Sequence, residues 1–166
     1  MDRDALIPCI GCGALVPDTD GPTHRYIGAS PGCWQRYGEL LAREYGEYAY
    51  PDVHRLTVDA YAVQHPGVPG KQSSQSVAVH LMSLCLVLER GWPVTRATAA
   101  MQRLTHRGYP WLEPPASRGE VTVLAVLAAA NLDDHMRRAR QWAESSWLAW
   151  PGHHATIRTW LEGAEL

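Results

Sequence analysis

One long apolar stretch, residues 73–90, limits what this chain can fold into. Its sequence is SSQSVAVHLMSLCLVLER, and its apolar residues point in nearly every direction around a helix rather than along one stripe. A helix that is apolar on all sides is buried inside a protein. The stretch is too short, and too interrupted by His80 and Ser83, to cross a bilayer, which requires roughly 20 apolar residues. It therefore predicts the central helix of a soluble helical domain.

Shorter helical patterns lie on both sides of this stretch. Ser30 and Pro31 are a typical N-cap and a typical first helical residue, and Gly46 ends the pattern that follows them. Residues 121–130 begin with strand-like alternation, but their length and their alanines favour a helix. The predicted helices span residues 31–45, 51–65, 73–90, 93–107, 121–130 and 132–150, with a last short helix from residue 151.

Residues 1–33 show neither helical nor strand periodicity and are rich in proline, glycine and aspartate. An irregular segment of this length inside a compact domain needs something to hold it in place. We therefore predict an all-α fold with a single domain. It consists of a helical bundle, residues 34–166, and a zinc-binding, cysteine-rich segment, residues 1–33.

Length and charge narrow the functional classes. The chain has 166 residues, which fits one domain, and a net charge of −2, which gives no electrostatic reason to expect nucleic acid or an anionic membrane as a partner. Its start lacks the apolar run of a signal peptide, so we expect a cytoplasmic protein. In that reducing compartment, neighbouring cysteines indicate metal or redox chemistry rather than disulfides.

Three cysteines near the start predict a zinc site. Cys9 and Cys12 lie in the sequence CIGCG, which has the form of a zinc knuckle: two thiolates on a tight turn bind one ion, and glycine lets the amides of the turn face the sulfurs. Cys33 lies where a helix should begin, and the positive end of the helix dipole favours a thiolate there. A redox CxxC of the thioredoxin type would lie between a strand and a helix, and no βαβ pattern is present.

Zinc takes four ligands in a tetrahedral arrangement, so the three cysteines require a fourth donor. His24 is nearest in the sequence, within the same irregular segment. His65, at the end of the predicted helix 51–65, is the next candidate. Cys85 is a third, although it belongs to the buried stretch. The sequence leaves the choice among these three open.

A second group of side chains could form a site between helices. Facing helices of a bundle carry metal and cofactor ligands on inward side chains. The simpler interpretation is that each histidine is a core residue hydrogen-bonded to a carbonyl or a tyrosine. His106 and His135 fall on polar faces, where solvation is the expected role. The group consists of His54, Asp59, His65, His80, His153 and His154, and Asp59, His80 and His154 are its candidates for catalysis.

Several short motifs together resemble a family of small, uncharacterised bacterial proteins. They are CxxCG at residues 9–13, PTHxY at 22–26, SPxCW at 30–34, DAYxxQHPG at 59–67, and WxxW followed by two histidines at 147–154. The resemblance spans most of the chain and implies no activity. It implies that the family pattern includes Cys9, Cys12, His24, Cys33, Asp59, His65 and His80.

Two functions are compatible with these features. In the first, Zn²⁺ is mainly structural, and the protein is a binding or accessory module whose pocket takes a small molecule or a protein partner. In the second, an open zinc position makes the chain a hydrolase or transferase, with Asp59 or a histidine as general base. We favour the first, because thiolate-rich zinc sites are more often structural. The pocket is expected to be lined by histidine and tryptophan, although tryptophans at helical spacing are more often core; the late ones are Trp142, Trp147, Trp150 and Trp160.

Overall fold

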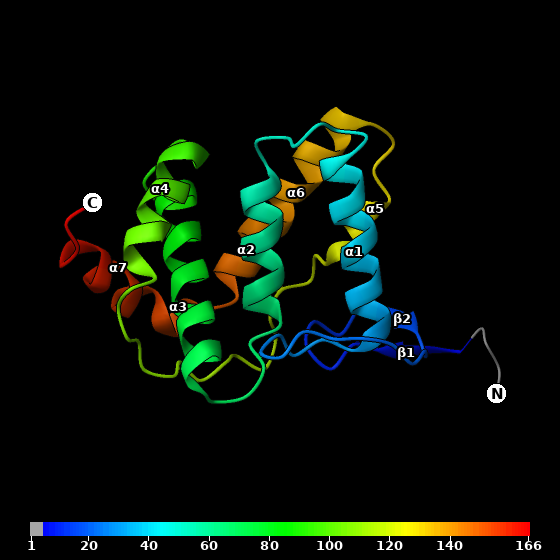
Figure 1. The fold of residues 1–166 in the computed structure, drawn as a ribbon, viewed down its shortest axis with the longest axis horizontal. Helices are drawn as coiled ribbons and strands as arrows, with labels where there is room; N and C mark the ends of the chain where they lie inside the picture. The colour runs from blue at the N-terminus through cyan, green and yellow to red at the C-terminus, as the bar shows by residue number, and fades with distance from the viewer. Residues whose placement is uncertain (1–4) are drawn as a thin grey trace.

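A computed structural model of the chain describes residues 5–166, which form seven α-helices and one small sheet (Figure 1). A π-helical turn and a 3-10 turn accompany the helices. In chain order the elements are β1 (Leu6–Pro8), β2 (Leu15–Pro17), α1 (Pro31–Tyr45), α2 (His54–Gln64), α3 (Lys71–Leu84), the π-helical turn Cys85–Glu89, α4 (Val94–Leu104), α5 (Val123–Leu127), α6 (Leu132–Leu148), the 3-10 turn Pro151–His153 and α7 (His154–Glu162).

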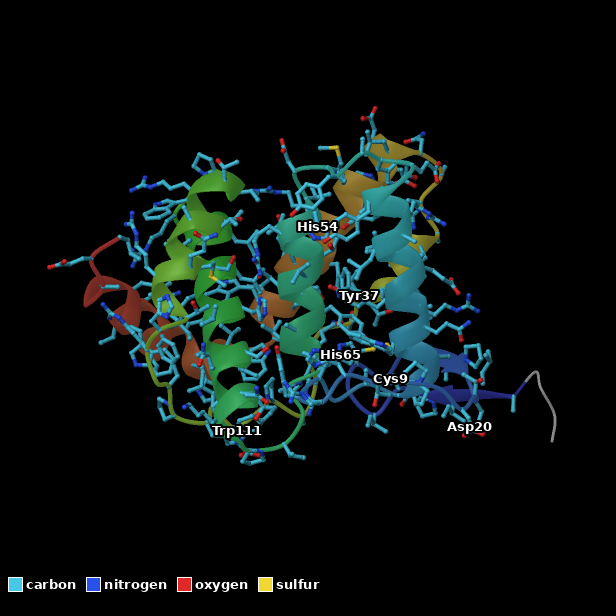
Figure 2. The ribbon with its side chains drawn as sticks, viewed as in Figure 1. Cys9, Asp20, Tyr37, His54, His65 and Trp111 are labelled. Atoms are coloured by element: carbon cyan, nitrogen blue, oxygen red, sulfur yellow. The ribbon has the colours of Figure 1, made fainter. Side chains whose placement is uncertain are left out.

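Helix α2 lies in the middle of the molecule, where it packs against α3 and α6 (Figure 1). Nine of its eleven residues are buried. On the side of α1, large aromatic side chains fill the space. Tyr37 of α1, labelled in Figure 2, stacks on Tyr61 of α2, with ring centroids 3.8 Å apart and planes inclined by 5°. Because α2 lies in the middle of the molecule, most of its polar residues are also buried in the interior.

The apolar stretch forms α3 and the π-helical turn, and its apolar part is buried as predicted. The central position predicted for it is wrong, because α2 lies in the middle. Every residue from 81 to 87 is buried. Arg90 N–H donates to Cys85 O at 3.2 Å, the wider hydrogen-bond spacing of a π-helix. Gly91, with φ of +65°, then ends the element, because this left-handed conformation disfavours residues with a side chain.

The N-terminal segment is not wholly irregular, so the prediction of an all-α fold is wrong in this part. Strands β1 and β2 pair antiparallel, with Ile7 opposite Val16. Strands of three residues are too short to show the alternation that identifies a strand in a sequence. The turn between them carries the CxxCG motif, and Gly13, with φ of +76°, lets Cys9 N–H donate to Ala14 O at 2.8 Å.

The other helices confirm the predicted pattern, with ends that differ by a few residues. Helix α1 has the predicted bounds, while residues 121–130 form only the short α5. Helix α6 begins at an N-cap, since Asn131 Oδ1 accepts from Asp134 N–H at 2.9 Å. No helix among residues 5–166 combines the length and the apolar character that crossing a membrane requires.

Candidate metal centre

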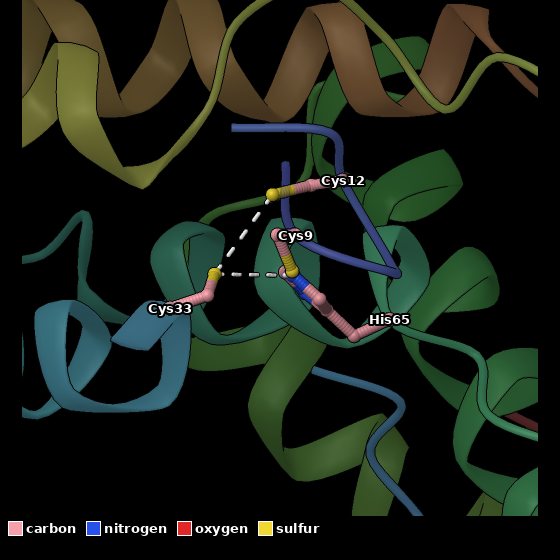
Figure 3. A group of neighbouring side chains, drawn as sticks. All are labelled: Cys9, Cys12, Cys33 and His65. Carbon is pink, nitrogen blue, oxygen red and sulfur yellow. Dashed lines mark hydrogen bonds between the residues drawn. The ribbon is translucent and has the colours of Figure 1, made fainter. Parts of the chain in front are cut away.

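Four side chains from distant parts of the sequence meet where α1 begins and α2 ends. They are Cys9, Cys12, Cys33 and His65, and their ligand atoms all lie within 4.8 Å of one another (Figure 3). Cys12 is half-buried and the other three are buried. Of the three candidates for the fourth donor, the structure brings His65 to the thiols.

The spacing of the donor atoms fits a tetrahedral zinc ion. The sulfurs of Cys12 and Cys33 are 3.8 Å apart, and Cys33 Sγ lies 3.4 Å from His65 Nε2. Zn–S bonds of about 2.3 Å and Zn–N bonds of about 2.0 Å give tetrahedral edges of about 3.8 Å between two sulfurs and about 3.5 Å between sulfur and nitrogen. Three cysteines and one histidine are also a common donor set for structural zinc. The residues present therefore fit the ion.

Local structure places each donor. Cys9 and Cys12 lie on the turn between β1 and β2, and Cys33 lies in the first turn of α1. His65 directly follows α2, with φ of −127° and ψ of 58°. The following residue, Pro66, disfavours the helical conformation at His65, so α2 ends where the imidazole meets the thiols.

Tyr61 fixes the orientation of the His65 ring. The His65 Nδ1–H group donates to Tyr61 O at 2.6 Å, which leaves the Nε2 lone pair facing the thiols. Metal-binding histidines typically donate their other N–H group in this way. The Tyr61 hydroxyl also donates to Cys33 Sγ at 3.6 Å, and its ring stacks on His65 at 4.0 Å. One residue of α2 thus supports two of the four donors.

Hydrogen bonds favour a thiolate at Cys9. Its sulfur accepts from Gly11 N–H at 3.4 Å and from Ser30 N–H at 3.5 Å. The pKa of Cys9 is held well below its usual range, mainly because the Cys12 and Cys33 thiols hydrogen-bond to its sulfur. The same contacts with Cys12 and Cys9, together with burial, raise the pKa of Cys33. A cation bound here would displace the remaining thiol protons.

Gly11 leaves the space into which the His65 ring fits. A Cβ atom at Gly11 would lie 2.3 Å from His65 Cδ2 and 2.5 Å from Gly28 O, closer than any real contact. The turn that carries Cys9 and Cys12, which we call the cysteine turn, can therefore approach His65 only with glycine at position 11. The sequence predicted a glycine role in turning the chain, and the structure adds this close approach.

Arg118 brings a positive charge to the centre. It lies between α4 and α5, and its Nη1 group donates to Gly11 O on the cysteine turn. Three thiolates with one Zn²⁺ would carry a net single negative charge, which a nearby guanidinium would compensate. Sequence reasoning missed this residue, because 107 positions separate it from Gly11 and it belongs to no motif.

The other two candidates for the fourth donor lie elsewhere. His24 packs edge-on against Tyr26, with ring centroids 4.3 Å apart, and lies 5.6 Å from the ring of Trp34. Cys85 lies in the π-helical turn, where its thiol is 3.6 Å from Glu89 Oε2. Burial is the main reason that the pKa of Cys85 rises to about 11, so this thiol stays protonated at neutral pH.

Two histidines of the bundle meet at a buried carboxylate. Glu44 is fully buried, and its oxygens lie 2.7 Å from His54 Nδ1 and 2.7 Å from His135 Nε2. Thr57 Oγ1 donates to the same carboxylate at 2.9 Å. The expectation that His135 is solvated is wrong, because the polar side of α6 at this point faces Glu44 rather than water.

Asp59 and His80 form a second polar pair, between α2 and α3. The Asp59 carboxylate is fully buried and accepts from His80 Nδ1 at 2.7 Å and from Arg55 Nε at 2.9 Å. Ser83 donates to its other oxygen. Although burial raises it, the pKa of Asp59 lies below its usual value, because the charge of Arg55 and the hydrogen bond from His80 favour the carboxylate.

The late histidines and tryptophans have structural contacts. His153 Nε2 lies 2.8 Å from Glu113 O, and His154 Nε2 lies 2.9 Å from Trp147 O. The His154 ring stacks on the Trp147 indole, with centroids 3.8 Å apart. The late tryptophans belong mainly to the core, as the helical spacing favoured; the buried ones are Trp142, Trp147 and Trp150.

Comparison with known proteins identifies one family. The chain matches the model of a family of unknown function, DUF5946, over residues 7–151. The match includes the four clustered side chains and all helices from α1 to α6. No curated protein and no solved structure matches the chain.

Proposed function

The chain belongs to the DUF5946 family of unknown function, and from its metal centre we propose that it is a zinc-binding protein whose ion is mainly structural. The observation that carries this proposal is the meeting of four donor atoms from three separate segments. An ion bound by all four cross-links the cysteine turn, the start of α1 and the end of α2. Four protein donors leave no position for water or substrate, as in structural zinc sites.

The donor types support zinc over other common cations. Thiolate and imidazole are preferred by zinc, whereas Mg²⁺ and Ca²⁺ prefer oxygen ligands. The tetrahedral spacing of the donors points the same way, because Mg²⁺ requires octahedral coordination. The hydrogen bond from His65 to Tyr61 O adds the outer support that is usual for a histidine on zinc.

For the binding role we propose a hollow beside the centre, which we call the aromatic recess. It has a volume of about 140 Å³ and is lined by His24, Tyr26, Trp34, Tyr37, Tyr61 and His80, among others. A cavity of about 150 Å³ can hold one benzene ring. Tyr61 contributes to both places, since its hydroxyl contacts Cys33 and Tyr61 is one of the residues that line the recess. The ion would thus maintain the shape of the pocket.

The alternative, a metal-dependent hydrolase or transferase, requires an open zinc position. Four donors at the site weigh against that interpretation. Asp59, the candidate general base, already accepts hydrogen bonds from Arg55, His80 and Ser83. No contact of the described residues favours this second function.

Substitution of Cys12 tests the structural role. We expect purified wild-type protein to contain one zinc per chain by elemental analysis, and Cys12→Ala to lose it. We expect the loss of zinc to cost Cys12→Ala about 3 kcal/mol of stability, which in a chain of this size lowers the melting temperature by about 6–12 °C. The matched control is Cys85→Ala, which removes a buried thiol outside the cluster and should retain the zinc.

Two results would contradict the proposal. One is wild-type protein that carries no zinc after purification and does not bind added Zn²⁺. The other is Cys12→Ala protein that has lost zinc but melts at the wild-type temperature. Cobalt substitution adds a test of the closed site, because a fourth position exchanging with solvent would change the Co²⁺ absorption spectrum when azide is added.

A further inference from the structure

His80 faces a second hollow, which we call the polar hollow. Its volume is about 450 Å³, and most of the residues that line it belong to α3. Tyr26, Ser76 and His80 line both the polar hollow and the aromatic recess, so the two adjoin. Polar side chains dominate the remaining wall: Lys71, Gln72, Gln75 and Thr105.

The charge of these walls differs from that of the whole chain. The chain has a net charge of −2, yet no aspartate or glutamate among residues 5–166 lines either hollow. Lys71, the single lysine of the sequence, lines the polar hollow, and none of the ion pairs found within the described residues involves it. Hydroxyl, amide and ammonium donors therefore surround a space without a competing carboxylate.

His80 is held in one orientation by a group that the solvent does not reach. Its Nδ1–H group donates to the buried Asp59 carboxylate at 2.7 Å, so Nε2 is the ring atom that His80 presents to the hollow. Arg55 Nη2 lies 3.1 Å from His80 Nδ1. Both groups are donors, and they lie close together because both donate to the same Asp59 oxygen. In the imidazolium form Nε2–H is a donor for an anion, and the Asp59 carboxylate compensates the added charge.

From these contacts we infer that the aromatic recess and the polar hollow form one site for a small ring compound that bears an oxyanion, either a phosphate or a carboxylate. The ring occupies the recess against Trp34, Tyr37 and Tyr61, and the oxyanion lies in the polar hollow at His80 Nε2, with the Lys71 ammonium on the wall of the same hollow. This inference rests on the pocket proposed above and names the chemistry of its ligand. Its test uses ligand affinity and His80 signals, and is therefore read out separately from the test of the ion.

Four probes separate the parts of this inference. Phenyl phosphate and benzoate carry a ring with an oxyanion, benzyl alcohol carries the ring alone, and inorganic phosphate carries the oxyanion alone. Each is titrated into the full, zinc-loaded chain, with calorimetry for affinity and the His80 ring signals in NMR spectra for location. We expect phenyl phosphate or benzoate to shift the His80 signals and to bind at least about tenfold more tightly than benzyl alcohol and inorganic phosphate. Benzyl alcohol lacks the charge-assisted hydrogen bond and inorganic phosphate lacks the buried ring, and each of these contributes at least that factor. The tighter of the two identifies the oxyanion.

Variants assign the anion contacts. Lys71→Gln, an exposed substitution that leaves the core intact, should weaken the tighter ligand at least about fivefold, and His80→Gln at least about tenfold. Arg140→Gln is the matched control: it removes one positive charge from the exposed face of α6 and should leave the affinity unchanged. Equal affinities of the Lys71 and Arg140 variants would overturn the assignment.

The outcomes also distinguish this inference from the proposed function. If benzyl alcohol bound as tightly as phenyl phosphate and benzoate, with the same His80 shifts, the proposed pocket would be supported. The inference that its ligand bears an oxyanion would be overturned. Absence of any shift with all four probes would overturn the inference and the binding role together. The zinc content and melting temperature of Cys12→Ala test the structural ion separately from either result.

Discussion

Gly11 is the residue at which the geometry of the candidate metal centre depends most directly on the absence of a side chain. A methyl group there would overlap the His65 ring and the Gly28 carbonyl. We predict that Gly11→Ala destabilises the zinc-loaded protein by about 1–3 kcal/mol, the usual cost of overpacking, and weakens zinc binding. Denaturant unfolding and zinc competition with a chelator measure the two effects.

Gly38 provides the control, because it lies in α1 and a Cβ atom at this position would have no neighbouring atom within 4 Å. Gly38→Ala should stabilise the protein by about 0.5–1 kcal/mol, since alanine is the better helix former. Equal behaviour of the two alanine variants would show that the Gly11 contact does not matter.

Glu44 is expected to make stability depend on acid pH. Burial alone raises its pKa, but hydrogen bonds from His135, His54 and Thr57 lower it below the ordinary value of 4.5. The folded chain therefore binds a proton at Glu44 less readily than the unfolded chain does. Its contribution to the free energy of unfolding is complete above pH about 4.5 and is lost as the pH falls toward the folded pKa.

We predict that Glu44→Gln costs about 2–3 kcal/mol at pH 7, because buried donors lose their charged acceptor. The difference between the variant and the wild type, from urea unfolding at each pH, should narrow as the pH falls from 7 to below about 4.5. A difference that stays constant across this range would show that the Glu44 carboxylate does not cause the pH dependence of the free energy of unfolding.

At the level of elements, Gln64 connects α2 to two other parts of the chain. Its Nε2 donates to the carbonyl oxygens of Arg118, at 3.0 Å, and Val121, at 2.8 Å, and its Oε1 accepts from Trp142 Nε1 at 2.8 Å. Gln64 is fully buried. The segment that carries Arg118 to the metal centre is therefore anchored by the last residue of α2.

We predict that Gln64→Leu lowers the free energy of unfolding by about 2–4 kcal/mol, because it leaves a buried indole N–H and two carbonyls without their partner. Chemical denaturation monitored by tryptophan fluorescence measures the loss. Gln35→Leu, on the exposed side of α1, should stay within about 0.5 kcal/mol of the wild type. A similarly small effect at Gln64 would refute the anchoring role.

The helices could be predicted because their signals are local. Pro31 marks the first residue of α1, whereas Ser30 occupies the N-cap position without capping, because its hydroxyl accepts from Ile10 N–H. The all-round apolar stretch identifies residues 81–87 as buried. The hairpin could not be predicted, since pairing between three-residue strands depends on the cysteine turn rather than on alternation. The length of the helix predicted at residues 121–130 was overestimated. Its alanines favour a longer helix, but α5 ends at Leu127, and Asn131 caps the start of α6.

Only the part of the candidate site that lies in short sequence motifs could be predicted. Cys9, Cys12 and Cys33 could be grouped from spacing and helix position, but the fourth donor could not be chosen. His65 reaches the thiols only because α2 crosses the interior and ends at Pro66, which is a tertiary property. Arg118 and the Glu44 partner of His135 depend in the same way on contacts between distant segments.

For the whole molecule, removal of zinc should have a graded effect. The ion would join residues 9–12 to the start of α1 and the end of α2, whereas α3, α4 and α7 pack together without contributing a donor. We predict that chelation accelerates hydrogen exchange first at residues 5–35 and 61–67, with a smaller change in α3 and α7. Mass spectrometry of peptide fragments measures this, and added Zn²⁺ should restore the slow exchange. A uniform increase over all helices would contradict this regional effect.

The order of the four donors along the chain has a consequence for biosynthesis. The last of them is residue 65, so all four leave the ribosome before the chain from α5 onward has been made. The cation can therefore be captured while the nascent polypeptide is still tethered, and the segment without regular helical structure acquires its shape early. The later helices would then assemble on a partner that is already ordered, which shortens the time during which the thiols are open to oxidation.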